Sequence, residues 1–120
     1  MDSEAMDLDA FEELVSRAYA ALPPWVQRSM ADVALLVGDR PSSSPGPGRL
    51  LLGCFVGVPR TRRGRRVPGS PPDRIELYRV PILRVCRSRE EVEAKVSMVL
   101  RHEIGHALGI GEERLRELGY

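Results

Sequence analysis

The chain contains 120 residues and carries a formal net charge of +1, with 18 Lys and Arg against 17 Asp and Glu. Its 42% hydrophobic and 29% charged residues are typical of a globular protein, and its length suits one compact domain, which we expect to span residues 1–120. The balanced charge excludes a global field that would attract nucleic acid or a membrane surface, and the longest apolar stretch, at 50–58, is too short to cross a bilayer.

The N-terminal segment and the cysteines bear on cellular location. The first ten residues include four acidic side chains and no basic one, the opposite of a secretory signal, so we expect a cytoplasmic protein. Cys54 and Cys86 are 32 residues apart and lack C-x-x-C spacing. This spacing predicts two buried free thiols rather than a disulfide or a thiolate zinc site.

The first predicted element is an amphipathic helix. Apolar residues recur every three or four positions over 8–22, Asp7 or Asp9 can cap the N-terminus, and the prolines at 23 and 24 end the helix. A short further helical turn is expected at 25–30.

Three apolar segments predict strands, at 31–37, 50–58 and 73–80. Two glycines in the second segment indicate a bulge or a close backbone approach, and Pro81 ends the third because its missing N–H interrupts a strand ladder. Loops are expected at 41–48 (PSSSPGPG) and at 59–73, which is rich in Pro, Gly and Arg.

A second long helix is predicted near the C-terminus. Residues 88–91, Ser-Arg-Glu-Glu, form a capping box, and Gly109 can adopt the left-handed conformation that ends a helix at about Leu108. The residues that follow are expected to form a short terminal helix.

The segment His102-Glu103-Ile104-Gly105-His106 matches H-E-x-x-H. On a helix this spacing sets two imidazoles one turn apart on one face, which is a zinc-binding geometry. The chain has only two histidines, and both lie in this motif, which argues against a chance match. Glu103 projects toward the apolar side of the helix, and a buried carboxylate needs partners such as a metal site.

A third zinc ligand is expected about ten residues after the first histidine. Gly109 and Glu112 extend the motif to H-E-x-x-H-x-x-G-x-x-E, and Glu112 directly follows the turn that brings the chain back toward the histidines. Glu113 and Glu117 are the other carboxylates in this segment.

With these residues the chain resembles the small bacterial zincin-like metallopeptidase family, formerly a domain of unknown function. The C-terminal HEIGHALGIGEERLRELGY and the segments FEELVSRAYAALP, LLGCFVGVPRTRR and PPDRIELYRVPI carry the resemblance, which covers most of the chain. It implies that His102 and His106 are zinc ligands, that Glu103 is the catalytic residue, and that Glu112 stands where relatives often carry an aspartate.

The predicted elements and the resemblance together imply an α+β fold. In this minimal zincin-like domain, the N-terminal helix and the H-E-x-x-H helix pack on a small mixed sheet of three or four strands. The implied protein is a zinc (Zn²⁺) metallopeptidase, a hydrolase that acts on a peptide or protein substrate. In this reading the metal activates a water molecule, and Glu103 takes its proton as general base.

Two alternatives remain open at this point. The zinc could be structural in an inactive interaction module. The basic run Arg60–Arg66 could contact nucleic acid, although no aromatic residues interleave with it and the whole chain is nearly neutral. The sequence does not define the peptide specificity or the oligomeric state.

Overall fold

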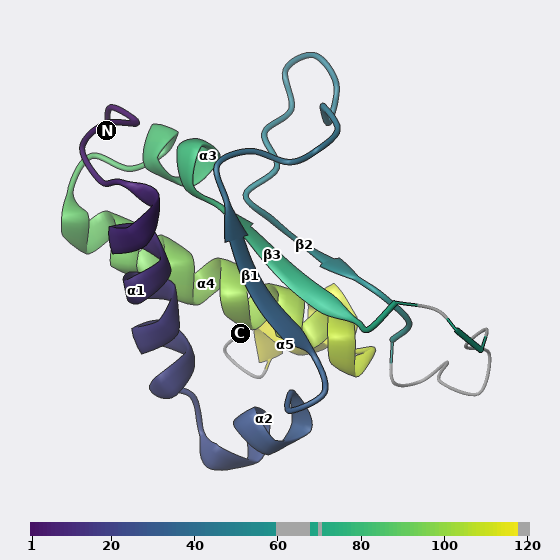
Figure 1. Ribbon diagram of the computed structural model, residues 1–120. Coiled ribbons are helices and arrows are strands. Elements are labelled where there is room, and N and C mark those ends of the chain that lie inside the picture. Colours follow the sequence, from purple (N-terminus) through teal and green to yellow (C-terminus); the bar gives the residue numbers. More distant parts are fainter. Residues whose placement is uncertain (60–67, 70, 118–120) are drawn as a thin grey trace.

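The computed structural model describes residues 1–59, 68–69 and 71–117, without the side chains of Glu112 and Leu115. Two long helices, α1 (Leu8–Ala20) and α4 (Arg89–Leu108), cover one face of a small β-sheet (Figure 1). This is the expected α+β fold. Among the described residues, no helix is both long and apolar enough to cross a membrane.

The sheet is mixed, as predicted. Within the described part of the chain it contains three strands in the order β1 (Ala34–Gly38), β3 (Arg74–Tyr78) and β2 (Gly53–Val56). The central strand β3 runs parallel to β1 and antiparallel to β2. Its register places Glu76 opposite Cys54 of β2, so the edge strand β2 is fixed beside the helix that carries the histidines.

The N-terminal helix is capped by Asp7, whose Oδ1 accepts a hydrogen bond from Ala10 N at 2.8 Å. This choice between Asp7 and Asp9 follows from the extended backbone of Asp7, which lets its carboxylate reach the first turn. The further turn expected at 25–30 is α2 (Pro24–Ser29), which starts at a proline, the residue best tolerated at that position.

The predicted strand at 73–80 is too long. β3 ends at Tyr78, and a short helix, α3 (Arg79–Arg84), follows at once. Pro81 lies in the first turn of α3, where backbone N–H groups have no partner within the helix, so a residue without an N–H loses no hydrogen bond there. Proline is therefore compatible with this helix start as well as with a strand end. The other two predicted strands, 31–37 and 50–58, are also shorter and are confined to β1 and β2.

The long helix α4 begins and ends as predicted. Ser88 Oγ accepts a hydrogen bond from Glu91 N at 3.1 Å, and Gly109 is left-handed with φ of 77°. The terminal helix is α5 (Glu112–Glu117). Both cysteines are free, but only Cys86 is buried, so the prediction of a buried Cys54 is wrong: this residue faces away from the helices and is half-buried.

The hydrophobic core lies between the sheet and the two long helices. Its central members are fully buried apolar side chains, each of which adds about 1.5–3 kcal/mol of stability. They include Phe11 and Val15 of α1, Leu77 and Ile75 of β3, and Val92, Val96, Leu100 and Ile104 of α4.

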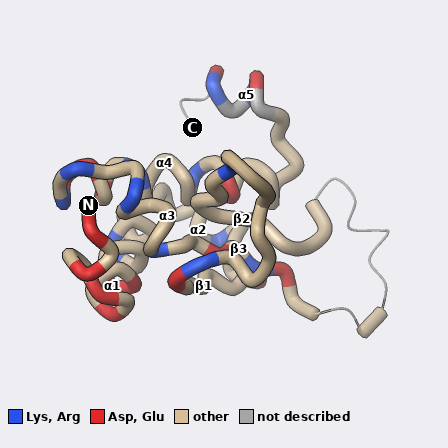
Figure 2. The backbone as a smooth tube through the Cα atoms, turned by 90° about the horizontal axis from the view of Figure 1, so that it is seen from above, with Lys and Arg blue, Asp and Glu red and all other residues tan. Residues whose placement is uncertain are grey.

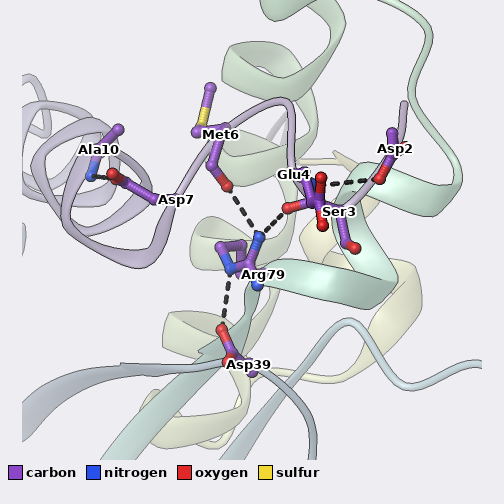
Figure 3. Close-up of polar contacts among 8 residues, drawn as sticks. All are labelled: Asp2, Ser3, Glu4, Met6, Asp7, Ala10, Asp39 and Arg79. Carbon is purple, nitrogen blue, oxygen red and sulfur yellow. Dashed lines mark hydrogen bonds and ion pairs between the residues drawn. The ribbon is translucent and has the colours of Figure 1, made fainter.

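One arginine ties the N-terminal segment to the sheet. Arg79 Nε lies 2.8 Å from Asp39 Oδ1, and its Nη1 donates to Met6 O at 2.8 Å and to Ser3 O (Figure 3). The segment is acidic, and its Asp and Glu residues lie on the same side of the molecule as those of α1 (Figure 2). Arg79 thus holds together the start of the chain, the end of β1 and the start of α3.

Candidate metal centre

The two histidines lie one turn apart on α4, as the motif predicts. Their ring centroids are 4.5 Å apart and the ring planes meet at 71°. The side chain of His106 is 39% exposed, so the ring is reachable from solvent. The helix alone sets this arrangement, since residues four positions apart lie on one face.

Glu103 is buried, which agrees with its predicted inward direction. The residue is 8% exposed, and its Oε1 accepts a hydrogen bond from the backbone N–H of Phe55 at 2.9 Å. The same oxygen lies 3.1 Å from His106 Nδ1. The carboxylate is therefore held between a histidine of its own helix and the edge strand β2.

Phe55, which also belongs to this site, was not predicted from the sequence. Phe55 contributes a backbone N–H, and every residue except proline carries one, so no side-chain pattern distinguishes it. The signal that was available is Gly53, one of the two glycines of segment 50–58 that were expected to mark a bulge or a close backbone approach. A Cβ atom at Gly53 would lie 2.7 Å from Val99 Cγ1 and 3.0 Å from Glu76 O, so a glycine lets β2 approach α4 this closely.

These side chains form a group that can hold a metal ion. One ligand atom from each of His102, Glu103 and His106 lies within 4.8 Å of the others. Imidazoles one helical turn apart suit zinc as two of its ligands, and the buried carboxylate of Glu103 lies beside them. The donors present therefore fit the metal that the motif predicts.

The third predicted ligand, Glu112, is not placed. It begins α5, but its side chain lies outside the described part of the structure. Of the other two carboxylates, Glu113 is exposed, and Glu117 pairs with Arg114 at 2.9 Å, with both side chains more than half exposed. The basic run Arg60–Arg66 also lies outside the described residues.

A mainly apolar cleft of about 380 Å³ opens beside the cluster. It is lined by Leu51, Leu52, Gly53, Met98 and Val99, together with His102 and Glu103. A ligand in this cleft would therefore contact apolar side chains of both α4 and the segment that leads into β2, while it lies next to the histidine and the carboxylate.

A second group of polar residues lies on the other face of the sheet. Glu76 Oε2 lies 2.6 Å from Arg74 Nε, and its Oε1 accepts a hydrogen bond from the Tyr78 hydroxyl at 3.0 Å. The bond from Arg74 is the main cause that lowers the pKa of Glu76. Burial, followed by the charges of Glu103 and Glu76, raises the pKa of the Cys54 thiol, which keeps it protonated and a poor metal ligand at neutral pH.

The α+β fold with an H-E-x-x-H helix beside an edge strand is that of the zincins. The family model of zincin-like metallopeptidases matches residues 30–120, and the chain belongs to this family. Among solved structures, it is similar to a conserved hypothetical protein from Thermus thermophilus, with 25% identity and a TM-score of 0.61. That match covers 86% of this chain and 94% of the other. No curated protein matches the chain.

Proposed function

We propose that the protein is a zinc-dependent peptidase. The observation that carries this proposal is the position of Glu103, a buried carboxylate fixed between His106 and the edge strand at the end of an apolar cleft. A structural zinc site needs only ligands, whereas an oriented carboxylate that borders a substrate-sized cleft is suited to move a proton.

In this proposal His102 and His106 hold the metal, with Glu112 as the third ligand. When bound, zinc supplies a Lewis acid that polarises the peptide carbonyl and lowers the pKa of the attacking water. Three protein ligands would leave a coordination position open, as catalytic zinc sites require.

Glu103 acts as general base and then as general acid. Its Oε1 is engaged by Phe55 N–H and His106, and within the described structure no contact engages Oε2. Oε2 is therefore the oxygen that receives the proton of the attacking water and returns it to the leaving amine. The contacts to Oε1 keep the carboxylate in one orientation while Oε2 works.

The test compares Glu103→Gln with wild type for zinc content and for cleavage of a quenched-fluorescence peptide library. We expect the variant to keep one zinc ion per chain and to lose about 100-fold or more in hydrolysis, because the amide cannot accept a proton. Glu90→Gln, an exposed carboxylate on the same helix, should behave as wild type. Unchanged turnover in Glu103→Gln would refute the base, and zinc binding without any hydrolysis by wild type would favour an interaction module.

The third ligand is tested by chelator competition. Glu112→Ala should release zinc at much lower chelator concentration than wild type, since a site with two histidines holds zinc weakly. Glu113→Ala and Glu117→Ala are the matched controls and should retain zinc. The opposite ranking would refute Glu112.

A further inference from the structure

A second pocket adjoins the cleft beside the metal cluster. The two share Leu51, and the segment 49–53 contributes Arg49 and Leu50 to the second pocket and Leu52 and Gly53 to the cleft. A ligand that extends along this segment therefore passes from one pocket into the other. Four residue steps span at most about 14 Å, so the two pockets lie within the reach of a short extended peptide.

The second pocket is basic. Its volume is about 290 Å³, and three of its lining residues are Arg40, Arg49 and Arg84, which come from the loop after β1, the segment before β2, and α3. No acidic residue lines it. The neighbouring carboxylate, Asp39, is bound to Arg79 instead.

The positive charge of this pocket is not compensated within the described structure. None of its three arginines forms an ion pair or a side-chain hydrogen bond with a described residue. Like charges gathered at one concave surface repel each other and favour an anionic ligand. The remaining lining is aliphatic, with Leu50, Val80 and Pro81.

We propose that the substrate is a peptide segment with an apolar side chain beside the scissile bond and acidic side chains within about four residues of it. The apolar side chain occupies the cleft of Leu51, Leu52 and Val99, and the acidic ones lie against the three arginines. This inference rests on the proposed peptidase function and adds the class of substrate.

A nucleic acid would be the other polyanion to consider. Single strands are bound by basic grooves that also carry large aromatic rings on which bases stack, and no Phe, Tyr or Trp lines either pocket. The exposed Trp25 lies on α2, at the opposite end of the sheet from α3 (Figure 1). The apolar and basic lining therefore favours an acidic peptide.

The test measures binding by fluorescence anisotropy with the zinc-loaded Glu103→Gln variant, so that the probe is not consumed. One labelled peptide has a leucine-rich centre with glutamates on both sides, which covers either direction of binding, and its partner carries glutamines in their place. We expect the glutamate peptide to bind at least about tenfold more tightly at low salt, with a preference that declines as salt is added.

The arginines are tested by reversing their charge. Arg49→Glu with Arg84→Glu should abolish the preference, the milder Arg49→Gln with Arg84→Gln should reduce it, and Arg28→Glu on the distant α2 should leave it intact. Circular dichroism checks that the variants are folded.

Three results would each overturn the inference. The two peptides could bind equally, or the preference for the glutamate peptide could survive in both double variants. The third is that a single-stranded oligonucleotide binds more tightly and displaces the peptide. Wild type could also cleave neither peptide although the glutamate peptide still binds more tightly and the arginine variants still lose that preference. In that case the peptidase function fails and the acidic-peptide site stands.

Discussion

Replacing Gly53 by alanine is the sharpest test of how the fold builds the site. The added Cβ would lie 2.7 Å from Val99 Cγ1, whereas carbon atoms in contact prefer about 3.5–4.0 Å. Val99 is buried and β-branched, so its side chain has little freedom to turn away. The second neighbour, Glu76 O at 3.0 Å, is backbone and cannot give way alone. We expect a loss of about 1–3 kcal/mol in the free energy of unfolding.

Gly53→Ala should also disturb the orientation of Glu103. To relieve the clash, β2 has to move away from α4 by nearly an ångström, which stretches the 2.9 Å hydrogen bond from Phe55 N to Glu103 Oε1 beyond its normal range. The base then loses one of the two contacts that orient it. Because ångström displacements of catalytic groups cost up to about 100-fold in rate, hydrolysis should fall by about tenfold or more while zinc content stays unchanged.

The assay combines urea unfolding with peptide hydrolysis. Gly38→Ala is the matched control, because Gly38 also lies in a strand of this sheet and a Cβ there meets nothing within 4 Å. Adding Val99→Ala to Gly53→Ala should recover part of the lost stability, seen as a coupling in the double-mutant cycle. If Gly53→Ala matches Gly38→Ala in both stability and rate, the close approach of β2 to α4 does not position the base.

Three other predictions concern stability. Hydrogen bonds from Arg74 and the Tyr78 hydroxyl lower the pKa of Glu76 in the folded state below its ordinary 4.5. Their contribution to the free energy of unfolding is therefore full above pH 4.5 and is lost as the pH falls through the lowered pKa. Glu76→Gln should thus cost about 1–2 kcal/mol in urea unfolding at pH 7 and almost nothing in strong acid; a difference independent of pH would contradict this. Arg79→Ala should cost about 2 kcal/mol and raise hydrogen exchange in residues 1–6, whose tie to the sheet it removes; unchanged exchange would show that Arg79 does not hold the segment. Zinc at about 100 times its Kd should add about 2.7 kcal/mol, visible as a higher Tm that a chelator reverses; a Tm indifferent to both would argue against the metal site.

The helices were predictable because their signals are local. A capping serine, an apolar period and a left-handed glycine define α4 within its 20 residues and the one on either side, and the apolar period with Asp7 or Asp9 as cap does the same for α1. The short helix α3 was missed because six residues are too few to show a period and Pro81 is compatible with both a strand end and a first helical turn. The strand limits depend on register with β3, which is set by partners far away in the sequence.

In the candidate site, too, the features set within one helix were predictable and those set by packing between distant segments were not. The relation of His102 to His106 and the inward direction of Glu103 follow from one helix, so the motif was enough to predict them. The partner of Glu103 is an N–H 48 residues away, which reaches it only because the sheet and the helix pack together. Which arginines line the second pocket is likewise decided by packing, since Arg40, Arg49 and Arg84 belong to three separate segments.

The central place of β3 has a consequence for synthesis on the ribosome. Each residue of β1 is made 40 residues before its partner in β3, as for Gly38 and Tyr78, and each residue of β2 is made 18–24 residues before its partner. At about 5–20 residues per second, β1 is without its partner for roughly 2–8 s. A nascent chain that stalls before residue 74 therefore presents two unpaired strand edges, which invite pairing with neighbouring chains. Rare or slow codons between β2 and β3 should accordingly increase aggregation more than the same codons placed after β3.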